Sequence, residues 1–180
     1  MANTYVKIAS VTVGAGGAAN ITFNSIPATF DDLTVAISSR SARNTGIGTS
    51  IYIKFNSSAS GYTYRYIYGQ GSSALSETQA SGSNLTTRGW VGFTSNTNNT
   101  ASTFGSANLY VPNYAGSTNK SYSSDFAQEN NSATDNLLGF NAGLWSNTAA
   151  ITSLEITLYQ GADFNLVEHS TATLYGIKKS

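Results

Sequence analysis

Cysteine is absent from this chain of 180 residues, and histidine and methionine occur once each. Without thiols, neither a disulfide nor a cysteine-based active site is available, and the redox compartment cannot be inferred. A transition-metal site normally needs two or more histidine or cysteine ligands, so His169 alone predicts a surface histidine rather than a metal ligand. The sequence therefore predicts no transition-metal site and no cofactor.

Charge is also scarce, because Asp, Glu, Lys and Arg together make up 10% of the residues and their formal net charge is zero. An average soluble protein has about 25% charged residues. Binding of nucleic acid through its phosphates needs an excess of basic residues, which this chain lacks. We therefore expect no nucleic-acid partner and a surface built from the hydroxyls and amides of Ser, Thr and Asn.

Long apolar runs are missing as well. No stretch approaches the roughly 20 apolar residues that span a membrane, and the first residues lack the basic start and apolar centre of a signal peptide. These absences predict a soluble protein without conventional secretion and without a membrane partner. A chain of this length is expected to form one domain that buries roughly 70% of its unfolded surface.

The pattern that is present is short-range alternation of apolar and polar residues. The segment from Ile21 to Arg40 is typical of strand, turn and strand, with Pro27 ending the first strand and Leu33, Val35 and Ile37 on one face of the second. Similar runs predict further strands at 5–13, 51–55, 62–68, 90–93, 104–111, 137–145, 151–159 and 171–177. No helix longer than a turn is expected. The predicted fold is all-β, a single-domain antiparallel β-sandwich or jelly roll.

The composition of two connections indicates their structure. Gly14, Gly16 and Gly17 separate the first two predicted strands, which is a hairpin signal. A phosphate-binding loop is not favoured, since no helix follows the glycines. The polar segment from Ser72 to Thr86 predicts a long surface loop. In terms of domains, residues 1–20 are expected to form an N-terminal strand or hairpin arm, and residues 21–180 the sandwich.

The most unusual local pattern is a row of tyrosines that share one strand face: Tyr62, Tyr64, Tyr66 and Tyr68. Three interpretations are open: packing within or along the sandwich, a subunit interface, or a platform for glycans. Tyr5 and Val6 are further interface candidates, because the strand from Thr4 to Val13 is suited to extending the sheet edge of a neighbour. Trp90 and Trp145 are expected in the core.

No arrangement of residues typical of catalysis is present. Asp31 and Asp32 are adjacent, so they either point to opposite faces of a strand or cap a turn. Glycoside hydrolysis needs two carboxylates across a cleft, and nothing favours a pair such as Asp125 and Glu155. No Gly-x-Ser-x-Gly motif occurs, and His169 is the one histidine that could act as a base. We expect the protein not to be an enzyme; a calcium site made of Asp and Asn oxygens stays open.

Several segments carry a resemblance to a known family. The runs 21–33, 55–56 with 62–69, 111–115, 145–156 and 170–177, the last reading Ser-Thr-Ala-Thr-Leu-Tyr-Gly-Ile, resemble a jelly-roll module of tailed-bacteriophage virion proteins. This module is found in head decoration proteins and at the tips of tail fibres. The similarity covers almost the whole chain, but its motifs are structural, so it assigns no catalytic residue.

The resemblance implies a non-enzymatic structural protein of the virion. A capsid decoration or cement protein is the leading expectation: a homotrimer on the capsid exterior, made in the host cytoplasm, that stabilises the head by bridging major capsid proteins. The alternative is a tail-fibre or receptor-binding module that recognises host surface glycans.

Overall fold

The computed structural model describes residues 4–78, 84–132, 134, 136–159 and 164–178. These residues contain twelve β-strands and a single 3-10 turn, η1 (Asn84–Thr87), and no α-helix. The prediction of an all-β fold is confirmed.

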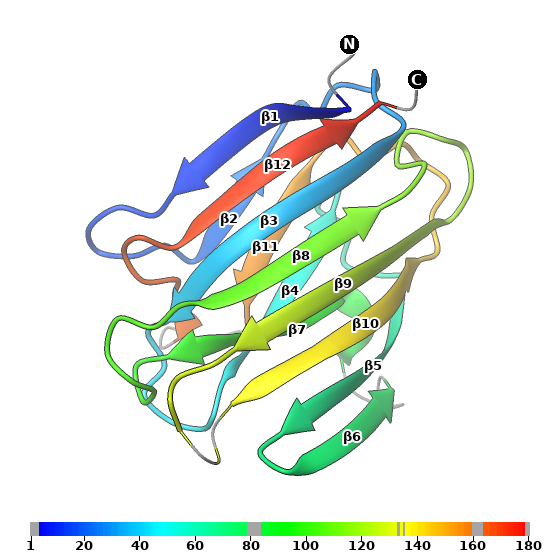
Figure 1. Ribbon diagram of the computed structural model, residues 1–180. Helices are drawn as coiled ribbons and strands as arrows, with labels where there is room; N and C mark the ends of the chain where they lie inside the picture. Colours follow the sequence, from blue (N-terminus) through cyan, green and yellow to red (C-terminus); the bar gives the residue numbers. More distant parts are fainter. Residues whose placement is uncertain (1–3, 79–83, 133, 135, 160–163, 179–180) are drawn as a thin grey trace.

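The larger of two layers is an eight-stranded sheet in which every neighbouring pair is antiparallel (Figure 1). Its strands, in spatial order, are β1 (Tyr5–Thr12), β12 (Thr171–Ile177), β3 (Asp32–Ser41), β8 (Gly105–Val111), β9 (Lys120–Gln128), β10 (Leu137–Trp145), β5 (Tyr62–Gln70) and β6 (Ser73–Thr78).

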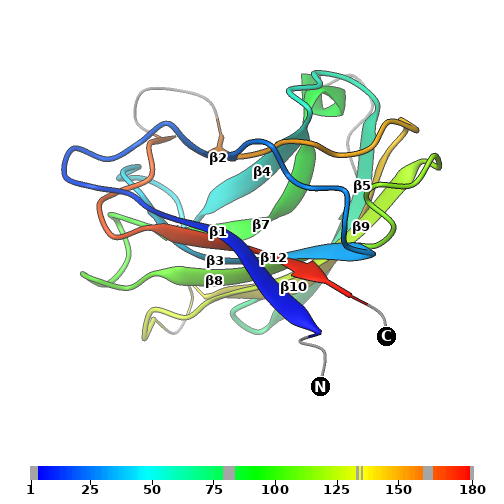
Figure 2. The same cartoon turned by 90° about the horizontal axis from the view of Figure 1, so that it is seen from above.

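The smaller layer has four antiparallel strands and packs against the inner face of the larger one (Figure 2). In spatial order they are β2 (Asn20–Phe23), β11 (Leu154–Leu158), β4 (Thr49–Phe55) and β7 (Gly89–Asn96). Besides packing face to face, the two layers are joined by backbone pairing at one corner. There, Arg40 and Ser41 of β3 pair in parallel with Ser95 and Asn96 of β7. The result is a β-sandwich.

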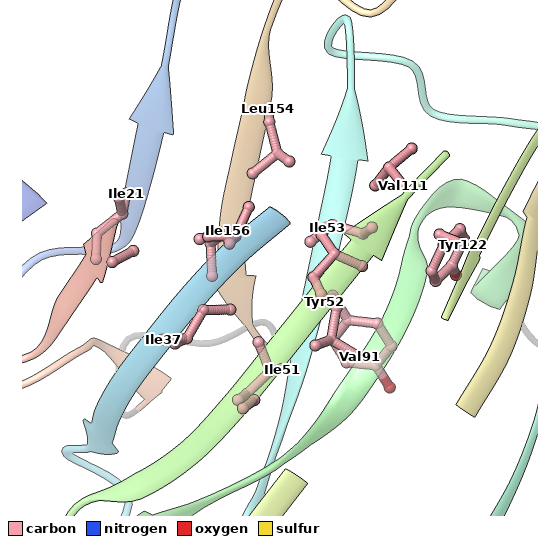
Figure 3. Packing of buried hydrophobic residues seen from close by; sticks show 14 of the residues in the cluster. Ile21, Ile37, Ile51, Tyr52, Ile53, Val91, Val111, Tyr122, Leu154 and Ile156 are labelled. Carbon is pink, nitrogen blue, oxygen red and sulfur yellow. The ribbon is translucent and has the colours of Figure 1, made fainter. Parts of the chain in front are cut away.

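The core fills the space between the layers because alternate residues of each strand point inward. In β8, β9 and β10, buried and exposed residues alternate, as in strands that have one face in the core and the other in solvent. Figure 3 shows Ile37 from the larger sheet among Ile51, Ile53 and Ile156 from the smaller one, and all four side chains are at most 3% exposed. The other half of the core is aromatic, and Trp90 and Trp145 lie in it at 2% and 1% exposure, as expected.

The structure corrects the expected hairpin between the first two strands. β1 pairs with β12 along its whole length, whereas β2 pairs with β11 in the opposite layer. The glycine segment 14–17 therefore carries the chain from one sheet to the other, and residues 5–12 form an edge strand of the larger sheet.

Two strands lie where none was predicted. β6 occupies part of the segment interpreted as a loop, and all six of its residues are exposed, so it carries no buried alternation. β9 turns Lys120, Ser124 and Gln128 inward together with Tyr122 and Phe126, so polar residues interrupt its apolar face.

Candidate interaction surface

The four tyrosines of β5 share one face, as predicted, but that face points into the sandwich. Tyr62 and Tyr64 are 0% and 5% exposed, and Tyr66 and Tyr68 are half-buried. The Tyr66 ring stacks on Trp90 with 4.0 Å between ring centroids, and Tyr62 stacks on Trp145 at 6.2 Å. The interpretation of Tyr62 and Tyr64 as interface residues is wrong, because their rings fill the core.

Tyr66 and Tyr68 are engaged within the chain as well. Their hydroxyls donate hydrogen bonds to the two carboxylate oxygens of Glu77 on β6, at 2.7 and 3.2 Å. Burial, together with the nearby Glu77 carboxylate, raises the pKa of both phenols above the usual value. Both hydroxyls are hydrogen-bond donors to Glu77, and the contact fastens β6 to β5.

Tyr5 and Val6 lie on β1, at one free edge of the larger sheet. Tyr5 is 61% exposed and Val6 is half-buried. The register of β1 against β12 shifts between Lys7 and Ala9, a bulge that bends the edge. No other described strand pairs with β1, so its outer backbone groups are open to a neighbour. Extension of a sheet by this strand stays a prediction.

A surface that sequence reasoning missed lies on the opposite face of the tyrosine strand. Ile67 of β5 stands directly across from Phe140 of β10, and Leu138 is the next outward residue along β10. These three side chains, which we call the outer patch, are 57%, 61% and 61% exposed. β10 gave a signal for it, since its sequence Leu-Leu-Gly-Phe-Asn-Ala-Gly-Leu-Trp has apolar residues on both faces.

The surroundings of the outer patch are small and nearly uncharged. From the register, the other outward residues of β9, β10, β5 and β6 are Ser121, Ser123, Asp125, Ala127, Ala142, Leu144, Thr63, Arg65, Gly69, Ala74, Ser76 and Thr78. Two shallow hollows of about 460 and 490 Å³ flank the row formed by Ile67 and Phe140. The surface is thus apolar at its centre and uneven in relief.

The two charged residues of this face lie on either side of the patch. Arg65 is two residues from Ile67 along β5 and stands across from Ala142, while Asp125 of β9 stands across from Phe140. Asp125 accepts a hydrogen bond from the Asn108 side-chain amide at 3.2 Å. Neither charge forms an ion pair with a described residue.

The candidate catalytic residues are not brought together. Asp125 lies on the outer face of the larger sheet, whereas Glu155 belongs to the smaller sheet and pairs with Lys54 at 3.8 Å. His169 is exposed in the connection before β12, with a positive φ of 71°. The described residues contain no group of three or more His, Asp or Glu side chains that could hold a metal ion.

Of the adjacent acids, Asp32 has a structural role. It is 2% exposed, and its carboxylate accepts hydrogen bonds from the Tyr110 hydroxyl at 2.7 Å and from the Asn113 backbone N–H at 3.0 Å. The hydrogen bond to Asp32, aided by burial, raises the pKa of Tyr110 to about 12. Asp32 thereby fixes the turn after β8 to the start of β3.

Two buried cations hold loops at opposite ends of the sandwich. The Arg40 guanidinium donates to the backbone oxygens of Thr100 and Thr103 at 2.8 and 2.7 Å. The Lys120 ammonium donates to the backbone oxygens of Gly116 and Thr148 at 2.6 and 3.4 Å. Burial lowers the pKa of both groups. Since their donors are used on carbonyl oxygens, both are structural groups.

Comparison with known proteins adds no relative. No protein-family model matches the chain, and no curated protein or solved structure matches it. Within the described part of the chain, no helix has the length and apolar character needed to cross a membrane.

Proposed function

We propose that this chain is a non-enzymatic structural protein of a tailed-bacteriophage virion, a decoration protein that binds the outside of the head and bridges major capsid proteins. The observation that carries the proposal is the outer patch. Three large apolar side chains in one cross-strand cluster, each more than half exposed, are typical of a protein that assembles with other chains, copies of itself included, since burial against protein gains about 25 cal/mol for each Å² removed from water.

The order of the strands supports the jelly-roll class that the resemblance implies. Four antiparallel pairs are nested within one another along the chain: β1 with β12, β2 with β11, β3 with β8 and β4 with β7. A long hairpin folded over into two sheets produces this nesting, which is the plan of a jelly roll. The remaining strands, β9, β10, β5 and β6, extend the larger sheet and carry the outer patch.

A glycan-binding module for host receptors is not carried forward. That alternative used the tyrosines as a stacking platform, together with loop amides. Tyr62 and Tyr64 are buried, and the Tyr66 and Tyr68 hydroxyls are bonded to Glu77, so the row presents little free surface to a sugar.

The test uses particles that lack the protein. We expect them to release DNA at a lower temperature, or at a smaller osmotic shock, than complete particles, and to regain resistance when purified protein is added back. Electron microscopy of the complete particle should place the chain on the head. Unchanged resistance, or density for the chain on the tail, would contradict the proposal.

A further inference from the structure

We propose that the outer patch is a site of self-association, at which a second copy of this chain binds face to face through a two-fold axis, with Arg65 of each copy against Asp125 of the other. The pairing rests on the composition and register of one sheet face and does not depend on the virion function.

The apolar centre supplies the driving force. Ile67, Leu138 and Phe140 form a compact cluster across β5 and β10, bordered by Ala142 on the same face. The four strands that carry this face have six to nine residues each. At the usual strand spacing they cover roughly 600 Å² per copy, so a face-to-face pair that covered the whole face would bury about 1,200 Å² in total, the lower end for a specific interface.

The charges identify the second copy as the occupant. In a two-fold interface, residue i contacts residue j and j contacts i, so a surface that binds itself must hold both members of every ion pair. This face has one positive and one negative residue, on opposite sides of Phe140. A two-fold axis in the plane of the interface, passing between Phe140 and Ala142, superimposes the position of Arg65 on that of Asp125. Both ion pairs then form at once, around an apolar centre.

The relief of the face agrees with this docking. The row of Ile67 and Phe140 is a ridge with a hollow on each side, one extending toward Arg65 and the other toward Leu138. In the proposed pair, side chains of a second copy would enter these hollows and displace water from the centre.

This arrangement differs from the homotrimer that the family resemblance implies. It also indicates how one assembly could bridge two capsid proteins. The outer patch and β1 lie toward opposite ends of the larger sheet (Figure 1). A pair joined at its patches therefore leaves two β1 edges, each with Tyr5 and Val6, facing outward. That last step rests on the proposed function, since it assigns the two free edges to two capsid proteins.

The experiment measures the mass of the isolated protein by sedimentation equilibrium over a range of concentrations. We expect a dimer, and at least a tenfold increase in its dissociation constant for Phe140→Glu, which places a charge at the apolar centre. Arg65→Asp should also weaken the dimer at least tenfold, and the double variant with Asp125→Arg should restore it to within about threefold of the original. Tyr5→Glu is the matched control, since Tyr5 is as exposed as Phe140 but lies on β1, and it should leave the dimer unchanged.

Folding of each variant is checked by circular dichroism, which should be unchanged because the substituted side chains are exposed. A wild-type chain that stays monomeric at about 100 μM would overturn the inference. A trimer, or a dimer that Phe140→Glu leaves intact, would overturn it too. So would a double charge reversal that fails to restore pairing, or binding of capsid protein in place of a second copy. None of these results alters the heat-shock test of the virion function.

Discussion

At the scale of single residues, the larger sheet is built by fitting aromatic rings into positions without side chains. Tyr122 and Phe126 of β9 point inward, and their neighbours on β10 include Gly143 and Gly139. A Cβ at Gly143 would lie 2.0 Å from Cζ of Tyr122, and one at Gly139 would lie 2.8 Å from Cζ of Phe126. The glycines therefore create the space in which the rings lie.

Gly143→Ala is expected to destabilise the fold by about 1 to 3 kcal/mol, because the buried Tyr122 ring must move to accommodate the new methyl group. Gly69→Ala is the matched control: Gly69 lies on the outer face of β5, and its added Cβ would be 3.8 Å from Leu138, an ordinary contact. Its effect should stay within about 0.5 kcal/mol. Urea unfolding measures both values, and equal effects of the two substitutions would contradict the packing argument.

The tyrosine row illustrates how much a residue pattern can predict. Alternation on β5 identified the strand and the shared face of Tyr62, Tyr64, Tyr66 and Tyr68. It left open which side of the sheet that face would meet, because tyrosine suits both a core and an interface. The contacts that decide the matter, with Trp90 and Trp145, come from strands that are distant in sequence.

At the scale of strands, the two edges of the larger sheet differ in how firmly they are attached. Among the strands that the structure describes, β6 pairs with β5 alone, and all six of its residues are exposed. β1 also has one neighbour, but its inward side chains are half-buried against the core. β3 lies between β12 and β8 and is bonded on both sides.

Hydrogen exchange should follow this order, with β6 fastest, β1 next and β3 slowest. We expect β3 amides to exchange at least about 1000-fold more slowly than those of β6, since local opening of an exposed edge exposes little apolar surface. Mass spectrometry of the exchanged chain measures this, best in the Phe140→Glu background so that self-association does not protect β6. Equal protection of β6 and β3 would show that the edge is not a separate opening unit.

The sequence largely predicted which segments form strands, but it did not predict which strands pair with one another. Ten of the twelve strands coincide with segments of visible alternation, whereas β6 and β9 lack a continuous apolar face. The expected hairpin of β1 and β2 failed for a different reason. Glycines make a turn easy to form, but burial of both strands required partners near the other end of the chain, β12 and β11.

At the scale of the whole molecule, buried tyrosines tie stability to alkaline pH. Burial raises the pKa of Tyr62, Tyr64 and Tyr122 above the value near 10 of an exposed tyrosine. The folded state therefore keeps these protons at pH values where the unfolded chain releases them. The stability that they contribute is intact below about pH 10 and falls as the pH rises further.

We expect the free energy of unfolding to decrease above pH 10 by about 1.4 kcal/mol per pH unit for each of these tyrosines. Urea unfolding at a series of pH values measures the slope. Tyr122→Phe should reduce it by the share of one tyrosine, whereas Tyr5→Phe should not change it, because Tyr5 is exposed in both states. A stability that stays constant from pH 9 to pH 12 would contradict this account.

The candidate surface was the part of the molecule least accessible to sequence reasoning. The outer patch combines Ile67 with Leu138 and Phe140, which are about 70 residues apart in the chain and become neighbours through the pairing of β5 with β10. Its two charges come from β5 and a strand that was not predicted, β9. Composition indicated a nearly neutral protein but gave no location for the apolar cluster on its larger sheet.

The first and last strands lie side by side, with Tyr5 opposite Ile177, so the start of β1 and the end of β12 lie at the same corner of the larger sheet (Figure 1). A short peptide joining them would close the backbone into a ring without disturbing any strand pair. The ring can then be opened elsewhere, for instance at the exposed turn between β4 and β5, to give a circular permutant with the same two layers. The same nested strand pairs can thus form in a chain that begins at a different residue.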